Sequence, residues 1–288
     1  MGRTWVVALV AGCYHPRAAT EIPCSPAGTC PAGQTCLAGI CEPDGTELPI
    51  DAAIDAAQPV DASVDAQMID APPPPPRITF VSKTQSTVLM ATPAASITVA
   101  HPTCPAGDVM IAAVAMGSTG SAAAPVFTPP TGWTLVKRLD RNNDTALAVY
   151  WHAAGAAEPM SYTWTLSTMI EGVAWISCYA NVDAAAPIEA QMGLVIETTG
   201  PAYTTPAITT TIGYSMIVAT FATHAAAATT WLPTGMTERV DVNNTTTRSG
   251  EGTEHLVPTA GSPAAYTSTA SSAQDYALVH VLALKPAP

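Results

Sequence analysis

Basic and aromatic residues are scarce in this 288-residue chain. It holds 10 lysines and arginines against 22 acidic residues, and aromatic residues make up 6% of the sequence. A protein that binds nucleic acid needs clustered Lys and Arg to displace the counterions of the phosphates, so a net charge of -12 argues against that class. Much of the 48% hydrophobic content is alanine, which buries little apolar area per residue.

Motifs that mark metal or nucleophile chemistry are also lacking. The six histidines form no H-x-x-x-H or H-E-x-x-H pattern, so we expect no cofactor and no catalytic metal. The run around Ser215 lacks the second glycine of a nucleophile elbow. The nearest approach to the paired carboxylates of a glycosidase is Glu251-Gly-Thr-Glu254, which we interpret as solvated loop acids. The chain is therefore predicted not to be an enzyme.

The negative charge is concentrated in one segment. Residues 18–76 contain nine acids and no base, whereas residues 77–288 contain thirteen acids and eight bases. Within residues 42–76, single aspartates alternate with alanines and five prolines close the segment. Such a composition cannot bury enough apolar area to offset the entropy of ordering, so residues 42–76 are predicted to be a disordered acidic linker.

The first residues have the features of an export signal. Arg3 precedes a short apolar run, and Val10-Ala11-Gly12 places small residues before Cys13. The run is shorter than the ~20 residues of a spanning helix. The pattern resembles the lipobox of bacterial lipoproteins. This resemblance implies a signal peptide over 1–12, acylation of Cys13, and a membrane-anchored protein at the cell envelope, in the outer membrane or at the surface. The alternative is an ordinary secretory signal followed by a coincidental cysteine.

Residues 13–41 contain a compact group of cysteines. Cys24, Cys30, Cys36 and Cys41 are separated by five, five and four residues. A small exported segment without a core is typically held by disulfides, and three pairings are open. Zinc is the alternative, but its sites usually have a C-x2-4-C knuckle. The stretch from Cys30 to Cys36 resembles the Cys-Pro-x-Gly-x-x-Cys modules of exported bacterial proteins, which implies no activity.

Residues 77–288 have the pattern of an all-β domain. They are rich in Thr, Val, Ile, Ser and Ala, with turn residues every 8 to 15 positions and no sustained helical period. In Tyr162-Thr-Trp164-Thr-Leu166, large apolar residues alternate with threonines, as in a strand with one buried face. We expect an antiparallel, jelly-roll-like β-sandwich. The expected strands cover 78–82, 96–100, 108–116, 133–140, 146–151, 162–166 and 173–180.

This block is internally repeated. Five landmarks of its first part recur in the same order at offsets of 101 to 106 residues, which indicates a duplication. The matching segments begin at Gly107 and Gly213, Pro130 and Pro233, Arg138 and Arg239, Pro159 and Pro263, and Ala174 and Ala277. Because each half is Ala-rich and has few strands, we expect the two halves to share one sandwich.

Three motifs of the first half suggest a relationship. They are Pro130-Thr-Gly-Trp133, Glu158-Pro-Met-Ser-Tyr162-Thr163 and Tyr179-Ala-Asn-Val182-Asp183. With them the block resembles a two-fold repeated β-sandwich domain of exported bacterial proteins that has no assigned chemistry. The resemblance implies a sandwich fold and a surface location.

Two loops rich in Asp and Asn could supply oxygen ligands to calcium. Asp140, Asn142 and Asp144 lie in the first, and Asp241 and Asn243 recur in the second. The alternative, which we prefer, is a pair of hairpin turns, because Asn and Asp tolerate positive φ and bond to their own backbone.

Aromatic side chains and two further cysteines complete the candidates. Most tryptophans are expected in the core, whereas Tyr150 and Trp151 are the candidates for stacking on a ligand. Cys104 and Cys178 form either a disulfide or two buried thiols.

These observations favour a non-enzymatic surface lipoprotein whose β-sandwich binds or adheres, with carbohydrate or an envelope polymer as the expected ligand class. The membrane is its other partner, through the lipid anchor. One alternative is a polysaccharide hydrolase or lyase on the same scaffold, which requires two close carboxylates in a groove. Another is a structural subunit of the envelope.

Overall fold

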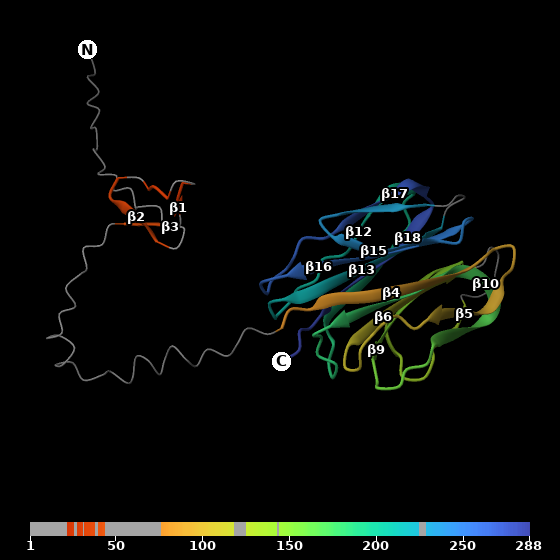
Figure 1. The fold of residues 1–288 in the computed structure, drawn as a ribbon. Helices are drawn as coiled ribbons and strands as arrows, with labels where there is room; N and C mark the ends of the chain where they lie inside the picture. The colour runs from red at the N-terminus through yellow and green to blue at the C-terminus, as the bar shows by residue number, and fades with distance from the viewer. Residues whose placement is uncertain are drawn as a thin grey trace, which may run out of the picture. The chain divides into compact units, whose positions relative to one another are not determined.

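The structure, a computed structural model, is all-β (Figure 1). The residues that it describes are 22–25, 28–30, 32–37, 40–43, 76–117, 125–142, 144–224 and 229–288. Within these ranges, no helix has the length and apolar character needed to cross a membrane. The predicted signal peptide 1–12, Cys13 and nearly all of the predicted linker lie outside the described residues. The chain divides into two compact units, Met1–Pro72 and Pro73–Pro288.

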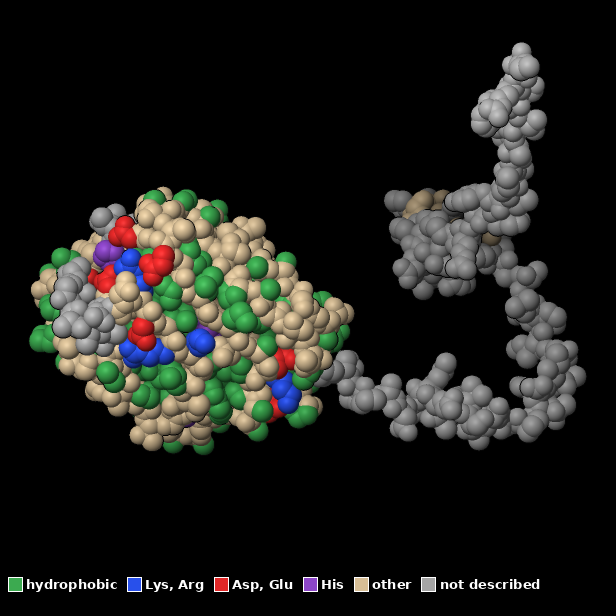
Figure 2. Space-filling model, turned by 180° about the vertical axis from the view of Figure 1, so that it is seen from behind, with side chains coloured by type: hydrophobic (Ala, Val, Ile, Leu, Met, Phe, Trp, Pro, Cys, Tyr) green, Lys and Arg blue, Asp and Glu red, His purple; other side chains and the backbone are tan. Residues whose placement is uncertain are grey.

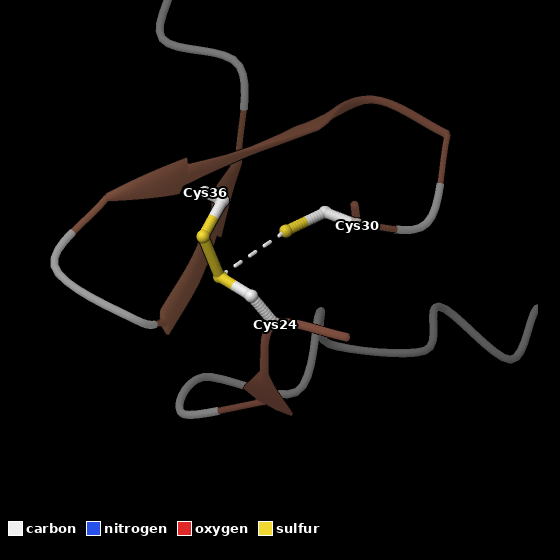
Figure 3. Close-up of side chains that lie close together, drawn as sticks. All are labelled: Cys24, Cys30 and Cys36. Atoms are coloured by element: carbon white, nitrogen blue, oxygen red, sulfur yellow. Dashed lines mark hydrogen bonds between the residues drawn. A yellow bond between two sulfur atoms is a disulfide. The ribbon is translucent and has the colours of Figure 1, made fainter. Parts of the chain in front are cut away.

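The first unit contains a small disulfide-linked sheet. Strands β1 (Ile22–Pro23), β3 (Ile40–Pro43) and β2 (Gln34–Leu37) pair in that order. A disulfide joins Cys24 to Cys36, with Cα atoms 5.9 Å apart (Figure 3). A second joins Cys30 to Cys41, with Cα atoms 5.6 Å apart. This pairing selects one of the three connectivities. Because all four sulfurs are in disulfides, none is available as a zinc thiolate.

The first half of the second unit is a sandwich of a large and a small sheet. Strand β10 belongs to both, because its C-terminal part pairs with β4 and β6 and its N-terminal part with β5 and β7. The large sheet has the order β4 (Thr79–Val88), β10 (Ser161–Ala180), β6 (Val109–Gly117), β9 (Thr145–Ala153) and β8 (Thr134–Arg141), and the small sheet adds β5 (Ala94–Ala100) and β7 (Phe127–Thr128).

The second half repeats this topology, which confirms the predicted duplication. Its large sheet has the order β11 (Ile188–Ile196), β18 (Tyr276–Leu284), β13 (Ser215–His224), β16 (Arg248–Val257) and β15 (Thr237–Asn243). Its small sheet has the order β12 (Gly200–Thr204), β17 (Thr267–Gln274) and β14 (Trp231–Thr234). Each strand takes the place of its counterpart, except that β17 and β18 replace the single strand β10.

Strand register corrects two of the sequence matches. Gly107 and Tyr214 are the positive-φ residues before β6 and β13, so the halves align there at an offset of 107 rather than 106. In the β8–β9 and β15–β16 pairs, the bulges coincide at an offset of 103, which aligns Arg138 with Asp241 instead of Arg239. A gapless comparison of the two sequences cannot detect such shifts. A shift of one residue in the alignment nevertheless assigns each side chain to the opposite face of the sheet.

Four layers of sheet form three cores. One core lies between the large and small sheets of the first half, and its counterpart lies inside the second half. The largest cluster joins the outer faces of the two large sheets, with Val109, Leu147 and Trp175 from one and Val218 and Leu282 from the other. The expectation of one shared sandwich is thus corrected: each half is a sandwich, and the two pack through their large sheets.

This packing explains the alanine-rich strands. Every residue of β6 and of β18 is buried, because each large sheet is covered on both faces. Strands buried on both faces have continuous apolar sequences, and small side chains allow neighbouring layers to approach closely. At Gly250 of β16, a Cβ atom would lie 2.5 Å from the Trp175 ring. The glycine therefore makes room for a tryptophan of the opposite sheet.

Replacing Gly250 by valine should weaken the junction of the halves. The added side chain would overlap the Trp175 ring, so we expect a loss of about 1–3 kcal/mol in the free energy of unfolding, measured in urea. Gly200→Ala is the control, because a Cβ atom there meets nothing within 4 Å. Equal unfolding midpoints for the two variants would contradict close packing of the large sheets.

Candidate functional site

The sandwich unit has two distinct ends. The chain enters at one of them, where the Asn181 side-chain amide donates to the Arg77 carbonyl oxygen at 2.9 Å. The chain also finishes there, since Val182 bridges to Pro286. We call this the tethered end. At the opposite or distal end, β4 turns into β5 and β10 bends from the large into the small sheet (Figure 1).

The distal end exposes several large apolar side chains. Leu89 and Met90 in the β4–β5 turn are 42% and 52% exposed, Val126 is 59% exposed, and Met169 at the bend of β10 is 64% exposed. The Ser167 N–H donates to the Val126 carbonyl oxygen at 3.1 Å, which attaches Val126 to the bend. Neighbouring exposed apolar groups are typical of interaction surfaces, so this end is the candidate binding face.

Charged side chains of the second half and the junction also gather at the distal end. Figure 2 shows acidic, basic and histidine side chains together at the end away from the chain entry. Arg141 contacts Glu197 at 2.8 Å and Asp144 at 3.0 Å, and His224 contacts Asp275 at 2.9 Å. Polar groups therefore flank the apolar side chains of this face.

Beneath this surface, a buried arginine links the two halves. Arg248 of β16 is 3% exposed and donates to the Tyr276 hydroxyl at 2.8 Å and to the Asp144 carboxylate at 3.3 Å. Burial opposes ionisation of Asp144, but the Tyr276 hydrogen bond and the Arg248 charge outweigh it and lower its pKa. Glu171, 3.7 Å from Arg248 and also buried, accepts from Asn244 at 3.0 Å. The cluster is internally paired and holds the halves in register.

The five calcium candidates do not converge. Asp140 pairs with Arg138 at 2.7 Å, and Asp144 belongs to the arginine cluster. Asn142 has φ 47° in the β8–β9 hairpin, as a turn residue does. Asn243 accepts from the Thr245 N–H at 3.1 Å. Asp241 is the exception, because its Oδ2 accepts from the Trp231 N–H at 3.2 Å while its Oδ1 is buried without a hydrogen bond.

Glu251 and Glu254 are not loop acids, which corrects the sequence interpretation. Both lie in β16 and are buried, at 0% and 4% exposure. Glu254 faces the junction and pairs with Arg239 at 2.5 Å. Glu251 faces the interior of the second half beside Asp241, its register partner on β15. Burial, with the charges of Glu238 and Asp241, raises the pKa of Glu251 to about 8, although a hydrogen bond with Ser268 opposes the shift.

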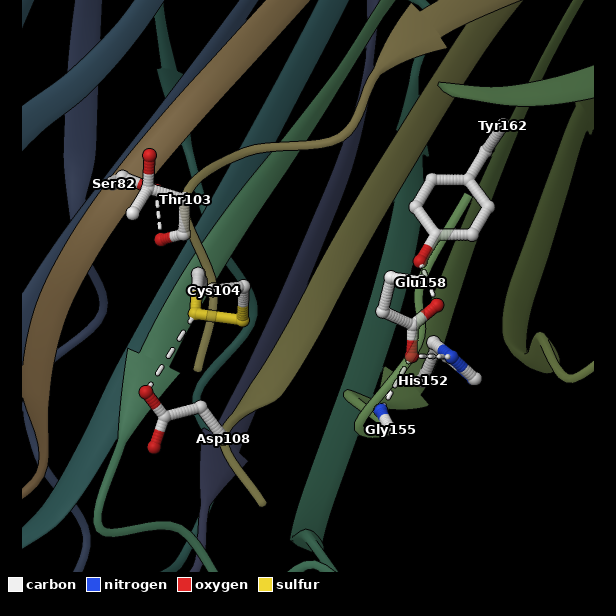
Figure 4. Close-up of a disulfide and its surroundings, with 9 residues drawn as sticks. Ser82, Thr103, Cys104, Asp108, His152, Gly155, Glu158 and Tyr162 are labelled. Atoms are coloured by element: carbon white, nitrogen blue, oxygen red, sulfur yellow. Dashed lines mark hydrogen bonds and ion pairs between the residues drawn. A yellow bond between two sulfur atoms is a disulfide. The ribbon is translucent and has the colours of Figure 1, made fainter. Parts of the chain in front are cut away.

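Hydrogen bonds to the Glu158 carboxylate hold the loop before β10 in place (Figure 4). Glu158 accepts from His152 at 3.0 Å, from the Gly155 N–H at 2.5 Å and from the Tyr162 hydroxyl. Burial opposes the charged form of Glu158, but these hydrogen bonds outweigh it and lower its pKa. Both ring nitrogens of His152 have hydrogen-bond partners, because its Nδ1 lies 2.9 Å from the Gly132 carbonyl oxygen. The Glu-Pro-x-Ser-Tyr motif thus fixes a loop.

Cys104 and Cys178 form a disulfide, which decides between the two alternatives (Figure 4). Their Cα atoms are 5.7 Å apart, and the bond joins the segment before β6 to β10. Asp108 lies beside it, with burial raising the pKa of its carboxyl. Cys104 is 9% exposed and Cys178 is 0% exposed, so the disulfide is sheltered from external thiols.

The aromatic candidates lie mostly inside the fold. Tyr150 is 3% exposed in the first-half core, where burial raises the pKa of its hydroxyl to about 12. Trp151 is partly buried against the core of the junction. Tyr150 therefore has no free ring face for a ligand, and Trp151 has only a partial one. Alternation along β9 could have indicated the inward position of Tyr150.

Comparisons with known proteins give no relative from which a function could be transferred. No family model matches the chain, and neither a curated protein nor a solved structure matches it.

Glu251 should make stability depend on pH. Its folded-state pKa of about 8 lies above the usual 4.5, so its protonated form favours folding and that contribution is lost as pH rises from about 4.5 to 8. Relative to Glu251→Gln, the wild type should lose about 5 kcal/mol across this window, measured by urea unfolding. Parallel pH profiles for the two proteins would show that Glu251 ionises normally in the folded state.

Proposed function

We propose that this chain is a non-enzymatic binding or adhesion protein that an acyl group on Cys13 anchors to the bacterial cell envelope. The observation that carries the proposal is the placement of the distal face. The sandwich unit is attached through residues 76–78 at its tethered end, whereas Leu89, Met90, Val126 and Met169 are exposed at the other end. The point of attachment and this face therefore lie at opposite ends of the sandwich unit.

The proposed ligand class is a carbohydrate or another polymer of the envelope. Its binding would combine apolar contact with Met90 and Met169 and hydrogen bonds to the flanking charged groups such as Arg141 and Glu197. Stacking on tryptophan is not part of the proposal, because Trp133, Trp164, Trp175 and Trp231 are buried.

The buried position of Glu251 supports a non-enzymatic role over the hydrolase alternative. A retaining glycosidase needs two carboxyl groups about 5–5.5 Å apart on either side of the substrate bond. Asp241 and Glu251 are register partners and so resemble such a pair, but Glu251 is 0% exposed. A polymer chain cannot reach an acid enclosed between two sheets.

The anchor can be tested with Cys13→Ser. We expect the wild type to fractionate with membranes and to yield an N-terminal peptide whose Cys13 carries acyl chains, because each buried methylene adds about 0.8 kcal/mol of membrane affinity. Cys13→Ser should appear in the soluble fraction, whereas the neighbouring Tyr14→Ser should behave as wild type. Mass spectrometry that finds an unmodified Cys13 in the exported chain would refute the anchor.

The binding face can be tested with charged substitutions. The full-length chain should co-sediment with isolated envelope polymer, and Met90→Glu combined with Met169→Glu should reduce the bound fraction at least tenfold, because charges replace the apolar contact. Met160→Glu is the control, since Met160 is 93% exposed in the loop before β10 at the tethered end. Undiminished binding by the double variant would exclude the distal face, and self-association without ligand would favour the structural subunit.

A further inference from the structure

The outer strand β11 of the second large sheet has a free edge. Among the strands that the structure describes, β11 pairs with β18 alone, so the backbone groups on its other side have no strand partner. The side chains of Met192 and Leu194 on this strand are 50% and 46% exposed. Free backbone groups at an edge can pair with another strand, and apolar side chains beside them add to the affinity. Strand β11 is therefore a second candidate interface, separate from the distal face.

Strand β11 lacks the charges that protect the other outer strands of the large sheets. Charged side chains lie along β4, β8 and β15, among them Lys83, Lys137 and Glu238. Such charges oppose edge-to-edge pairing, because a partner strand would have to bury them. Glu189 is the one charged residue of β11, and it lies near the start of the strand, where it accepts from the Thr211 N–H at 2.9 Å. The rest of the β11 edge is open to an apolar partner.

The first half shows how the equivalent strand is covered. The offset of 103 residues between β10 and β18 puts Ser82 of β4 at the position of Met192. It puts Thr84 at the position of Leu194. The Ser82 hydroxyl donates to the Thr103 carbonyl oxygen at 2.7 Å, so the chain after β5 contacts this part of β4. In β11 an apolar side chain replaces each hydroxyl group and remains half exposed. The fold therefore does not require apolar residues at these two positions.

A second copy of this chain fits the free edge of β11. Two such strands can pair antiparallel about a two-fold axis, and a register centred on Gly193 places Met192 opposite Leu194 of the second copy. Residues 190–196 are uncharged, so this register brings no charges together within them. Both free edges are occupied at once, and the two five-stranded large sheets join into one continuous sheet. The edge is thus complementary to itself in shape, polarity and charge.

We propose that two copies of this chain associate through antiparallel pairing of their β11 strands. Met192 of each copy then packs against Leu194 of the other, and both side chains lose exposed apolar area. The acids that flank the paired segment are bonded within their own copy, because Glu189 is hydrogen-bonded and Glu197 pairs with Arg141 at 2.8 Å. The contact closes after two copies, because a two-fold contact uses the same edge in both. It differs in this respect from the open-ended assembly of a structural subunit.

The pairing fixes the relative orientation of the two copies. Strand β11 begins at the tethered end, where the Lys285 N–H donates to the Pro187 carbonyl oxygen at 2.8 Å. It finishes at the distal end, where Glu197 follows it and contacts Arg141. Antiparallel strands run in opposite directions, so the tethered end of one copy lies beside the distal end of the other. Copies anchored to two opposing surfaces meet in this orientation. That last step rests on the proposed anchor, whereas the pairing does not.

The test is sedimentation equilibrium of the full chain with Cys13→Ser, which removes the proposed acylation site and keeps the whole sandwich unit. This parent chain should form dimers without added ligand, and no larger species. Adding Met192→Glu or Leu194→Lys should raise the dimer dissociation constant by about tenfold or more, because each places a charge against an apolar side chain. Leu232→Lys is the control, since Leu232 is 72% exposed on β14 of the small sheet, and it should dimerise as the parent does.

A mixture of the two single variants tests the register and shows that both variants are folded. Met192→Glu in one copy then lies opposite Leu194→Lys in the other, so the mixed dimer should be about tenfold or more tighter than the dimer of either variant alone. Met90→Glu combined with Met169→Glu should dimerise as the parent does, which separates this edge from the distal face. A monomeric parent, species larger than a dimer, dimers retained by both single variants, or no gain in the mixture would overturn the proposal.

Discussion

The face-to-face packing of the two large sheets is the constraint on which the rest of the molecule depends. One face of each large sheet is covered by the small sheet of the same half, and the other face is covered by the large sheet of the other half. Burial on both faces favours alanine and valine in β6, β13 and β18, which contain no Asp, Glu, Lys or Arg. It also forces the paired charges of Arg248, Asp144 and Glu171 to the distal margin of the junction, where they hold the halves in register.

The two halves share a topology but differ in what fills them. The first has an aromatic interior, in which Trp133 contacts Tyr162 and Trp164 edge-on at 5.0 and 5.3 Å. The second places Glu251, Thr253 and Ser268 at corresponding positions between its sheets. A hydrophobic core alone is sufficient for the first half. The second half carries polar groups in part of the same space, so the two copies share a topology but differ in the chemistry of their interiors.

The sequence predicted the all-β class, the antiparallel duplication and the paired cysteines, because alternation, repeated landmarks and cysteine spacing are local signals. It did not predict that Glu251 is buried. The run Arg-Ser-Gly-Glu-Gly-Thr-Glu has no apolar alternation, since its buried positions carry polar groups and its glycines face Trp175. One signal was available in the internal repeat. At an offset of 103 residues, Glu251 aligns with Ala148, which lies in the strand predicted over 146–151. The layers could not be predicted, because a sheet buried on both faces lacks the alternation that marks a surface.

Strand β4 gives the molecule a mechanical polarity. The chain enters the sandwich unit at the start of β4, which then runs antiparallel to β10 through nine register pairs towards the distal end. A load applied between the tether and a partner at that end acts along the strand, so these pairs are sheared together rather than opened one at a time. The disulfide from Cys104 to Cys178 crosslinks β10 to the segment before β6. A connection of this geometry resists unfolding when the sandwich unit is pulled at its two ends.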